Sequence, residues 1–307
     1  MDTPGAVTLL GLTKRFGDIA AVDDLTLEIR KGELFGLVGP DGAGKTTTLR
    51  LLTAIMEPTS GEARVAGHSI VKEGERLKEK IGYMAQRFGL YEDLTVYENI
   101  IFYADLYEVP RRERPARIER LLGFSNLTPF KGRLAGKLSG GMKQKLGLAC
   151  ALIHTPDVLF LDEPTNGVDP VSRRDFWKIL YDLLKDGMTI VVSTAYLDEA
   201  ERCTRVGLMH RGKLLMVDEP AKVKTSLGLR MAEVWVDDAR SAAAVAREAR
   251  GIREVSIYGD KLHITLEPET TADGLAGALR DKGVTVKSRR EIVPSLEDVF
   301  IAMVKER

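Results

Sequence analysis

A glycine-rich loop that ends in a lysine and a threonine is the first candidate for chemistry in this chain. Residues 39–47 read GPDGAGKTT and fit the pattern G-x-x-x-x-G-K-[ST]. Glycines let the backbone N–H groups of such a loop turn inward around phosphate oxygens, and the positive N-terminal end of the next helix adds to the attraction. We expect Lys45 to reach the β- and γ-phosphates and the Thr46 hydroxyl to ligate Mg²⁺. The residues expected to hold the phosphates are Gly39, Pro40, Asp41, Gly42, Ala43, Gly44, Lys45, Thr46 and Thr47.

Two adjacent acids, Asp162 and Glu163, supply the second candidate. They follow the apolar run VLFL at residues 158–161. A carboxylate at the C-terminal end of a buried strand can hold Mg²⁺, directly or through water, and this role fits Asp162. Glu163 is then placed to orient and polarise an attacking water. A solvated turn is the alternative for two acids in a row, but the apolar residues before them and the upstream loop favour a site.

The elements expected around these residues are strands that alternate with helices. Apolar and polar residues alternate over residues 6–30, as in antiparallel strands. Buried strands are expected over 33–39, 157–164 and 188–194, a helix over 45–56, mostly helix over 83–135 with breaks at Pro110, Pro115 and Pro129, and a hairpin over 206–219 with its turn at Arg211 and Gly212. The phosphate loop thus lies between a strand and a helix.

Composition changes near Thr225, where a second part of the chain is expected to begin. Strands are expected over 232–236, 254–258, 262–267 and 284–288, with helices over 241–250 and 272–282. This βαββαβ order fits a ferredoxin-like fold. A last helix follows Pro294, with Ser295 and Asp298 spaced as in a capping box.

Composition excludes several classes of protein. The 307 residues include 45 Lys and Arg and 45 Asp and Glu, so the net charge of zero argues against a strongly basic nucleic-acid binder. Two cysteines, Cys150 and Cys203, cannot build a disulfide framework or a four-ligand zinc site. No apolar run approaches the roughly 18 residues of a membrane span, and the first residues do not resemble a signal peptide. We therefore expect a soluble, intracellular, globular chain.

A third segment, LSGGMKQK at residues 138–145, gives the chain a family resemblance. It begins 19 residues before DVLFLDEP. With the phosphate loop and the two acids in this order, the chain resembles the ATP-binding subunit of an ABC transporter. The resemblance implies an α/β fold, a P-loop NTPase cassette with a RecA-like core, an antiparallel β subdomain and a helical signature subdomain, over residues 1–224. A small α+β ferredoxin-like domain is expected over 225–307.

The resemblance also implies ligands and roles for further residues. ATP and Mg²⁺ are the expected ligands, and two subunits are expected to hold two ATP molecules between them, head to tail. Ser139, Gly140 and Gly141 would face the γ-phosphate held by the other subunit. Phe16 would stack on adenine, with a core phenylalanine as the alternative. Gln86 would sense Mg²⁺ and the permease, and Asp169 would communicate across the dimer.

The tail and an aromatic cluster point to partners. The tail with its PSLEDVF ending resembles the C-terminal domain of daunorubicin-resistance-type exporter ATPases. The family receives a coupling helix of the permease in the region of residues 83–107, and aromatic side chains suit such docking. Core packing is the alternative for most of these aromatics, and Tyr91 and Tyr97 are the better candidates for contact. The seven aromatics of this region are Tyr83, Phe88, Tyr91, Tyr97, Phe102, Tyr103 and Tyr107.

Two positions depart from the family. The family usually has histidine where this chain has Ala195, and a methyl group can neither donate nor accept a hydrogen bond. Loss of one positioned polar group near a transition state commonly costs about 10²–10³ in rate, and His210 is not expected to replace it. Asp41 stands where asparagine is usual and is expected to point to solvent or to a basic partner group.

The loss at Ala195 is one-sided, because Lys45, Thr46, Asp162, Glu163 and the LSGG segment are all present. We therefore expect a pair of unlike ATPases in which this chain's own site is slow. A homodimer that hydrolyses ATP through Glu163 is the alternative.

The leading hypothesis is the ATPase subunit of a multi-component membrane exporter. It would lie at the cytoplasmic face of the cell membrane, where it contacts the membrane only through a permease, and would bind no nucleic acid. A soluble ABC-type ATPase acting on ribosomes or DNA, and a structural subunit that binds ATP with little hydrolysis, are the rival classes.

Overall fold

The computed structural model describes residues 5–87 and 89–305. The chain divides into two compact units, Met1–Asp218 and Glu219–Arg307. The sequence predicted a boundary between residues 224 and 225, which lies at the end of helix α8 (Pro220–Thr225). The two units instead meet between residues 218 and 219, so that α8 belongs to the second unit. Pro220 lies in the first turn of that helix, where its missing N–H costs nothing, so the helix can begin directly after Glu219.

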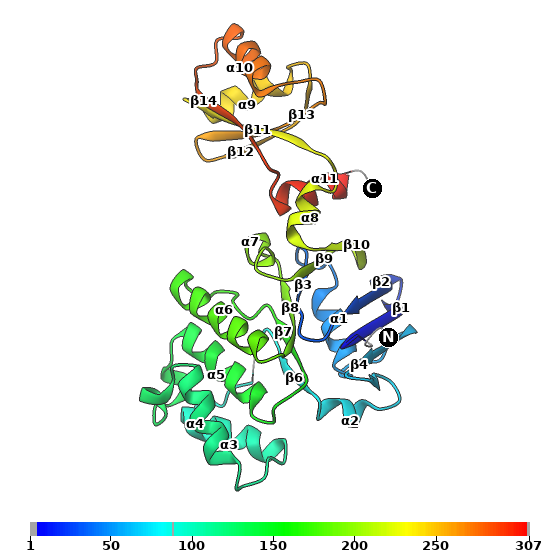
Figure 1. Cartoon of the computed structure of the whole chain (residues 1–307), viewed down its shortest axis with the longest axis vertical. Helices are drawn as coiled ribbons and strands as arrows, with labels where there is room; N and C mark the ends of the chain where they lie inside the picture. Colours follow the sequence, from blue (N-terminus) through cyan, green and yellow to red (C-terminus); the bar gives the residue numbers. More distant parts are fainter. Residues whose placement is uncertain (1–4, 88, 306–307) are drawn as a thin grey trace. The chain divides into compact units, whose positions relative to one another are not determined.

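A six-stranded sheet forms the centre of the first unit (Figure 1). Its order is β10 (Lys213–Asp218), β9 (Arg205–His210), β3 (Leu34–Val38), β8 (Thr189–Thr194), β7 (Val158–Asp162) and β6 (Ile81–Met84). All neighbours are parallel except β10, which pairs antiparallel with β9. Every residue of β3, β7 and β8 is buried, as expected of parallel strands covered on both faces. These are the three buried strands expected from the sequence.

An antiparallel sheet lies beside the central one, with the order β2 (Ile19–Ile29), β1 (Val7–Phe16), β4 (Ser60–Val65) and β5 (His68–Ser69). Helix α1 (Lys45–Leu52) contributes Leu49 to a core shared with Leu12 of β1 and Phe160 of β7. This helix ends four residues before the expected Met56, because Ala54 adopts a left-handed backbone with φ of 54°. Helix α2 (Gly74–Lys78) follows the small sheet.

Helices α3 (Val96–Leu106), α4 (Arg114–Phe124), α5 (Gly140–Leu152) and α6 (Pro170–Lys185) lie away from the antiparallel sheet (Figure 1). The short α7 (Leu197–Ala200) follows β8, and single 3-10 turns occupy Thr128–Phe130 and Ala135–Lys137. A break at Pro115 was expected, but this residue instead lies in the first turn of α4, where no N–H is needed. The described residues also place the end of β6 at Met84, inside the stretch expected to be helical.

A tight hairpin joins β9 to β10 at the expected turn. Arg211 has φ of 46° and Gly212 has φ of 80°. A two-residue turn with positive φ at both positions has a backbone twist that matches the twist of the two strands it joins.

The second unit has the expected βαββαβ order. Its elements are β11 (Arg230–Val236), α9 (Ala239–Arg247), β12 (Ile252–Tyr258), β13 (Lys261–Leu266), α10 (Ala272–Asp281), β14 (Val286–Ile292) and α11 (Leu296–Lys305). The strands form one antiparallel sheet in the order β12-β13-β11-β14. Asp238 accepts hydrogen bonds from the N–H groups of Arg240 and Ser241, so α9 begins earlier than the expected residue 241. The capping box of Ser295 and Asp298 is confirmed by reciprocal hydrogen bonds.

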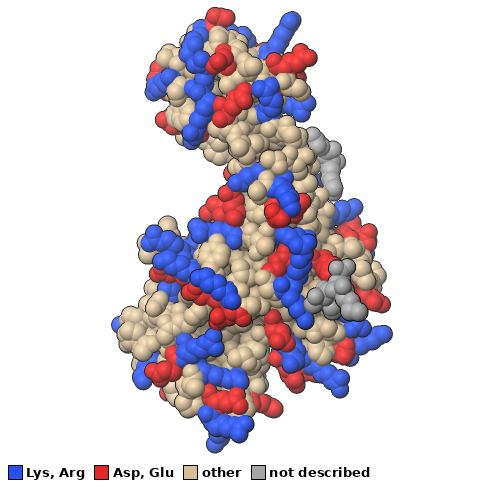
Figure 2. Space-filling view, in the orientation of Figure 1, with Lys and Arg blue, Asp and Glu red and all other residues tan. Residues whose placement is uncertain are grey.

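Charges of both signs are interspersed over the face shown in Figure 2. The helices that the structure describes include none that is both long enough and apolar enough to cross a membrane.

A nearly inaccessible carboxylate, Glu233, lies on β11 with its side chain 3% exposed. Burial raises its pKa, but hydrogen bonds from Lys261, His263 and Arg290 outweigh burial and hold the pKa at about 2. The two neighbouring cations also face the ring of Trp235, at 5.4 Å for Lys261 and 5.2 Å for Arg290. The ionised carboxylate therefore stabilises the folded sheet.

Acid should remove this stabilisation. Because the folded pKa of Glu233 is depressed, its contribution is complete above the ordinary pKa of about 4.5 and is lost as the pH falls toward about 2. Wild-type chain should lose up to about 3 kcal/mol more free energy of unfolding across that window than Glu233→Gln. Urea denaturation followed by Trp235 fluorescence, in a Trp177→Phe background, measures the difference. Parallel pH profiles for the two chains would contradict the assignment.

Candidate functional site

The glycine-rich loop connects β3 to α1 and approaches other backbone segments closely. A Cβ atom at Gly39 would lie 2.3 Å from the carbonyl oxygen of Met209, and one at Gly44 would lie 2.3 Å from that of Ala21. Gly44 has φ of 104°, a conformation that side chains oppose, and is the N-terminal cap of α1. The close approach of the backbone at Gly39 and Gly44 therefore leaves no room for a side chain at either position.

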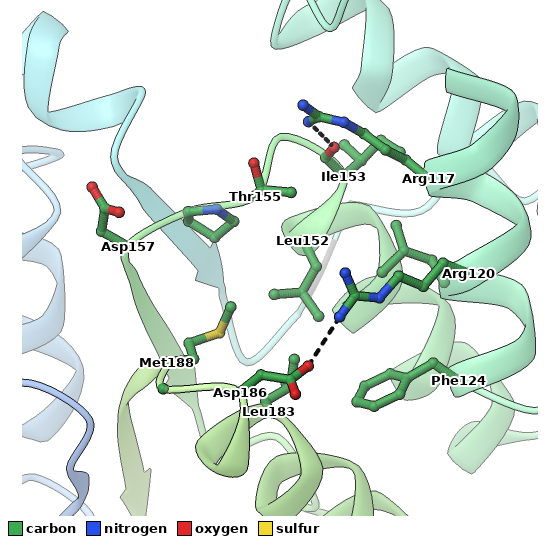
Figure 3. A pocket seen from close by; sticks show the side chains of 13 residues that line it. Arg117, Arg120, Phe124, Leu152, Ile153, Thr155, Asp157, Leu183, Asp186 and Met188 are labelled. Atoms are coloured by element: carbon green, nitrogen blue, oxygen red, sulfur yellow. Dashed lines mark hydrogen bonds and ion pairs between the residues drawn. The ribbon is translucent and has the colours of Figure 1, made fainter. Parts of the chain in front are cut away.

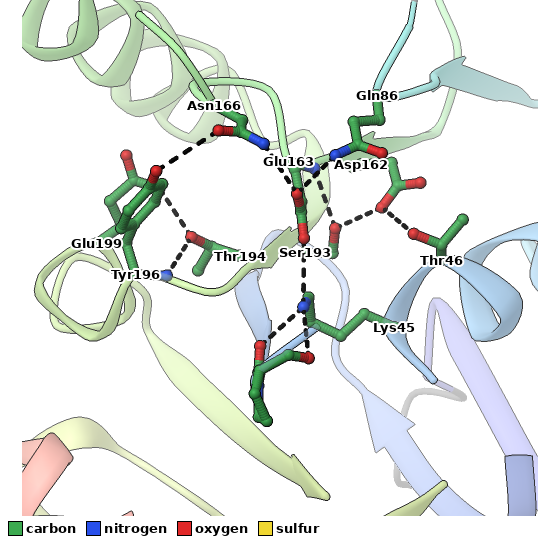
Figure 4. Close-up of polar contacts among 12 residues, drawn as sticks. Lys45, Thr46, Gln86, Asp162, Glu163, Asn166, Ser193, Thr194, Tyr196 and Glu199 are labelled. Atoms are coloured by element: carbon green, nitrogen blue, oxygen red, sulfur yellow. Dashed lines mark hydrogen bonds and ion pairs between the residues drawn. The ribbon is translucent and has the colours of Figure 1, made fainter. Parts of the chain in front are cut away.

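Lys45 curls back over this loop and is only 4% exposed. Its ammonium donates hydrogen bonds to the carbonyl oxygens of Gly39 (2.7 Å) and Pro40 (3.1 Å). It also forms an ion pair with Glu163, with 3.2 Å between Nζ and Oε1. The loop thus holds a positive charge at its centre, next to the carboxylate that the sequence assigned to catalysis (Figure 4).

Asp162 ends β7 with 1% of its surface exposed. Its Oδ1 accepts hydrogen bonds from Thr46 Oγ1 at 3.0 Å and from Ser193 Oγ at 2.6 Å. Burial, followed by the nearby charge of Asp162, raises the pKa of the Tyr83 hydroxyl to about 12, so Tyr83 is neutral beside it. Thr46 and Asp162, both expected to ligate Mg²⁺, therefore lie together.

These oxygen atoms fit a divalent cation of the Mg²⁺ type. Mg²⁺ prefers oxygen ligands and is usually held by one or two carboxylates together with substrate phosphates and water. Within residues 5–87 and 89–305, no cluster of three or more His, Cys, Asp or Glu side chains could hold a metal alone. Phosphate oxygens or water would supply the other ligands of a cation held at Thr46 and Asp162.

Glu163 follows in a left-handed backbone conformation with φ of 48°, which is uncommon for a residue other than glycine. Its N–H donates to the Oγ and to the carbonyl oxygen of Ser193, at 3.0 and 3.2 Å. Its Oε2 accepts from Gln86 Nε2 at 2.9 Å and from Asn166 Nδ2 at 3.3 Å. The strained turn directs the carboxylate back toward the loop, where the surrounding contacts hold it.

An open cavity of about 470 Å³ collects most of the predicted residues. It is lined by Ala21, Asp41, Gly42, Ala43, Gly44, Lys45, Thr46, Thr47, Gln86 and Glu163. Gln86 comes from the segment after β6 and Ala21 from β2, so the structure brings together four parts of the chain that are distant in sequence. Asp41 is exposed and lines this cavity, and its expected direction toward solvent or a basic partner group stays a prediction.

Phe16 lies at the end of β1 and is 50% exposed, with Lys14 Nζ 5.3 Å from the centre of its ring. This exposure excludes the core-packing alternative. The side chain is not part of the cavity lining, whereas Ala21 on the neighbouring strand is.

Ser139 caps α5 by accepting a hydrogen bond from the N–H of Met142 at 3.4 Å. Ser139 and Gly140 are exposed and Gly141 is buried. None of the three lines the cavity at the phosphate loop.

Four of the residues around the acids were not predicted as site residues: Ser193, Asn166, Thr165 and Glu199. Ser193 lies near the end of β8, a strand that the sequence predicted, but it meets Asp162 because β7 and β8 are parallel neighbours with their carboxyl ends at one edge, which only the structure shows. Thr165 and Asn166 come from the turn after β7 and Glu199 from α7, and no pattern in the sequence marks them.

A second cavity, of about 340 Å³, lies between α4 and the turns that follow α5 and α6 (Figure 3). Leu121, Phe124, Leu152 and Met188 contribute its apolar wall. Arg120 pairs with Asp186 at 2.9 Å across it. It contains no residue that the sequence singled out.

Two families match separate segments of this chain. The family described as "ABC transporter" matches residues 22–166, which include the phosphate loop, the LSGG segment and both acids. The family described as "ATP-binding protein DrrA1-3-like, C-terminal domain" matches residues 219–304, the second unit.

Several curated proteins are similar over nearly the whole chain. "Probable multidrug ABC transporter ATP-binding protein YbhF" of Escherichia coli K12 is 46% identical over 300 residues, which are 96% of this chain and 51% of that protein. The chain thus spans about half the length of the YbhF proteins that it matches. "Daunorubicin resistance ATP-binding protein DrrA2" of Streptomyces coeruleorubidus is 34% identical, over 98% of this chain and 96% of that one. "Nod factor export ATP-binding protein I" of Burkholderia lata is 37% identical, over 94% of each.

Solved structures match the cassette unit. An ATP-binding subunit of an ABC transporter has a TM-score of 0.66 and 27% identity over 73% of this chain and 93% of its own. A dimeric ATP-binding cassette in a post-hydrolysis state, bound to ADP and Pi, has a TM-score of 0.63 and 28% identity over 69% of this chain and 98% of its own.

Two glycines of the loop should respond differently to alanine. Gly42→Ala meets open space and should cost only the strain of a positive φ, about 1 kcal/mol. Gly44→Ala would in addition force a methyl group onto the Ala21 carbonyl and should cost more than about 3 kcal/mol. Urea denaturation of the two variants measures both values. Equal costs would show that the loop does not follow the path described.

Proposed function

The chain belongs to the ABC transporter ATP-binding family, whose cassettes are ATPases, and we propose that it is the ATP-hydrolysing subunit of a membrane exporter. The observation that carries the proposal is the meeting of Lys45, Thr46, Asp162 and Glu163 around the phosphate loop. Lys45, Thr46 and Glu163 line one open cavity, and the buried Asp162 contacts it through its hydrogen bond from Thr46.

Hydrolysis follows from the chemistry of these side chains. We expect ATP phosphates to compete with Glu163 for the Lys45 ammonium, which would release the carboxylate that now pairs with it. Glu163 would then orient a water toward the γ-phosphorus, and Thr46 and Asp162 would hold Mg²⁺ with help from Gln86. Bound Mg²⁺ supplies positive charge that offsets the charge of the phosphates. The new bond joins the water oxygen to the γ-phosphorus as the bond to ADP breaks.

The proposal extends to an unlike partner ATPase. Ala195 is exposed after β8 and places a methyl group where the family usually has an imidazole, so we expect this chain's own site to be slow. Ser139, Gly140 and Gly141 lie outside that site and would serve the nucleotide of the partner, as Asp169 would communicate with it. The YbhF proteins leave about as much chain outside the match as within it, which is length enough for a second cassette. A homodimer working through Glu163 is the alternative.

Export is proposed from the names of the relatives and from an aromatic surface. The relatives are named for multidrug transport, daunorubicin resistance and Nod factor export. Tyr91 and Tyr97 are 48% and 43% exposed, and the ring of Tyr91 lies 4.5 Å from that of Phe102. Phe88, another expected member of this cluster, lies outside the described residues. We propose that this surface receives the permease and holds the chain at the cytoplasmic face of the membrane.

The hydrolytic role of Glu163 is testable in the assembled complex. Glu163→Gln should lower single-turnover ATP hydrolysis at this chain's own site by at least about 100-fold and retain ATP binding, because the amide keeps the shape but cannot take up a proton. Glu62→Gln, an exposed acid on β4, is the matched control and should change neither quantity. If Glu163→Gln left both hydrolysis and transport unchanged, this chain's site would not drive the exporter. That result would favour the alternative of a structural subunit that binds ATP with little hydrolysis.

Capture of the chain from native membranes in mild detergent tests its partners. A permease and a second, different ATPase should co-purify. Tyr91→Ala and Tyr97→Ala should each lower permease recovery about tenfold, as buried aromatic anchors do, whereas Leu10→Ala at the exposed face of β1 should not. A permease with only copies of this chain would contradict the unlike pair. Ribosomal or DNA partners without a permease would contradict the exporter.

A further inference from the structure

We propose that Tyr196 positions Glu163 through the side-chain amide of Asn166, in a site whose switch position is Ala195. The inference rests on the proposed role of Glu163 in hydrolysis. It assigns a task to a residue that neither the sequence patterns nor the family resemblance singled out.

A buried acid, Glu199 on α7, fixes the turn that carries Tyr196. Its carboxylate is 1% exposed and accepts hydrogen bonds from Thr165 Oγ1 at 2.5 Å and from Thr194 Oγ1 at 2.9 Å. Arg173 of α6 balances its charge, with 3.4 Å between Nε and Oε1. A buried charge is tolerated only with such partners. The carboxylate therefore ties the end of β8 to the loop that follows β7 and to α6.

The contacts of Thr194 and Arg173 with Glu199 also set the direction of the Tyr196 ring. The Tyr196 N–H donates to Thr194 Oγ1 at 3.0 Å, the hydroxyl that itself donates to Glu199. The guanidinium of Arg173 lies 4.7 Å from the centre of the ring. The ring is 39% exposed, yet backbone and cation hold it from two sides.

Two hydrogen bonds in series connect Tyr196 to Glu163 (Figure 4). The Tyr196 hydroxyl donates to Asn166 Oδ1 at 3.5 Å, and Asn166 Nδ2 donates to Glu163 Oε2 at 3.3 Å. The amide accepts at its oxygen and donates at its nitrogen, so the chain has one polarity, from hydroxyl to carboxylate. Both contacts are long, and contacts of this kind commonly tighten when the reacting complex forms.

The relay formed by these two hydrogen bonds matters because Glu163 is expected to lose one of its partners. Lys45 occupies Oε1, and ATP phosphates would draw that ammonium away. Gln86 and Asn166, both on Oε2, are the remaining side-chain hydrogen-bond donors to this carboxylate among the described residues. Ala195 adds none. Tyr196, by fixing the Asn166 amide, supplies part of the orientation that an imidazole one residue earlier would give.

Single-turnover ATP hydrolysis by the assembled complex tests the relay, with the rate of this site taken as wild type minus Glu163→Gln. Tyr196→Phe keeps the ring and its contact with Arg173 but removes the hydroxyl. It should lower the rate about threefold to tenfold, the scale of one neutral hydrogen bond, and leave ATP affinity within about twofold. Tyr181→Phe, which removes a hydroxyl bonded to the Arg202 carbonyl, is the matched control and should leave the rate unchanged.

Restoring the imidazole separates positioning from folding. In an Ala195→His background, Tyr196→Phe should cost less than about twofold, because the histidine takes over the task. An unchanged rate for Tyr196→Phe, or an equal loss in both backgrounds, would overturn the proposal. If Tyr196→Phe lowers the melting temperature, Asn166→Ala in the two backgrounds tests the same relay with the same expected results. A wild-type rate equal to that of Glu163→Gln would instead contradict the proposed function itself.

Discussion

The carboxylate of Asp162 lies at the end of a strand that is buried along its whole length, and 1% of the residue is exposed. A charge withdrawn from water must be met by hydrogen-bond donors, or the folded state loses several kcal/mol. Thr46 of α1 and Ser193 of β8 meet it, at 3.0 and 2.6 Å. This one requirement fixes where the first turn of α1 and the ends of β7 and β8 lie relative to one another, and the phosphate loop is the segment that joins β3 to that helix.

The neighbouring acids show how the same requirement is met with different outcomes. Glu199 is enclosed by two hydroxyls and Arg173, and its contacts hold the turn after β8. Glu163 keeps contact with an open cavity, and its partners are Lys45, Gln86 and Asn166. Its left-handed backbone, with φ of 48°, costs energy that the hydrogen bonds to Ser193 help to offset. Glu199 is therefore enclosed by its partners, whereas Glu163 lines a cavity and has a strained backbone.

The second unit also contains a buried carboxylate whose charge is met by hydrogen-bond donors. Glu233 on β11 is as inaccessible as Asp162, and its three partners come from β13 and β14, so one carboxylate crosslinks the middle of the sheet. Apolar side chains such as Val234 and Ile264 alternate with these polar ones and pack against α9 and α10. The period of two along each strand divides the sheet into an apolar and a polar face.

The sequence by itself determined the features whose residues are contiguous. The phosphate loop, the pair of acids after an apolar strand, the hairpin turn at Arg211 and Gly212, and the βαββαβ order of the tail all depend on local backbone rules. Only the tertiary structure decided which side chains meet. Ser193 and Asp162 are 31 positions apart, and Gln86 and Glu163 are 77 apart. They touch because the sheet order places β8 and β6 on either side of β7, so that strand ends distant in sequence share one edge. Strand order depends on the packing of the whole chain, and for this reason no local pattern could have revealed it.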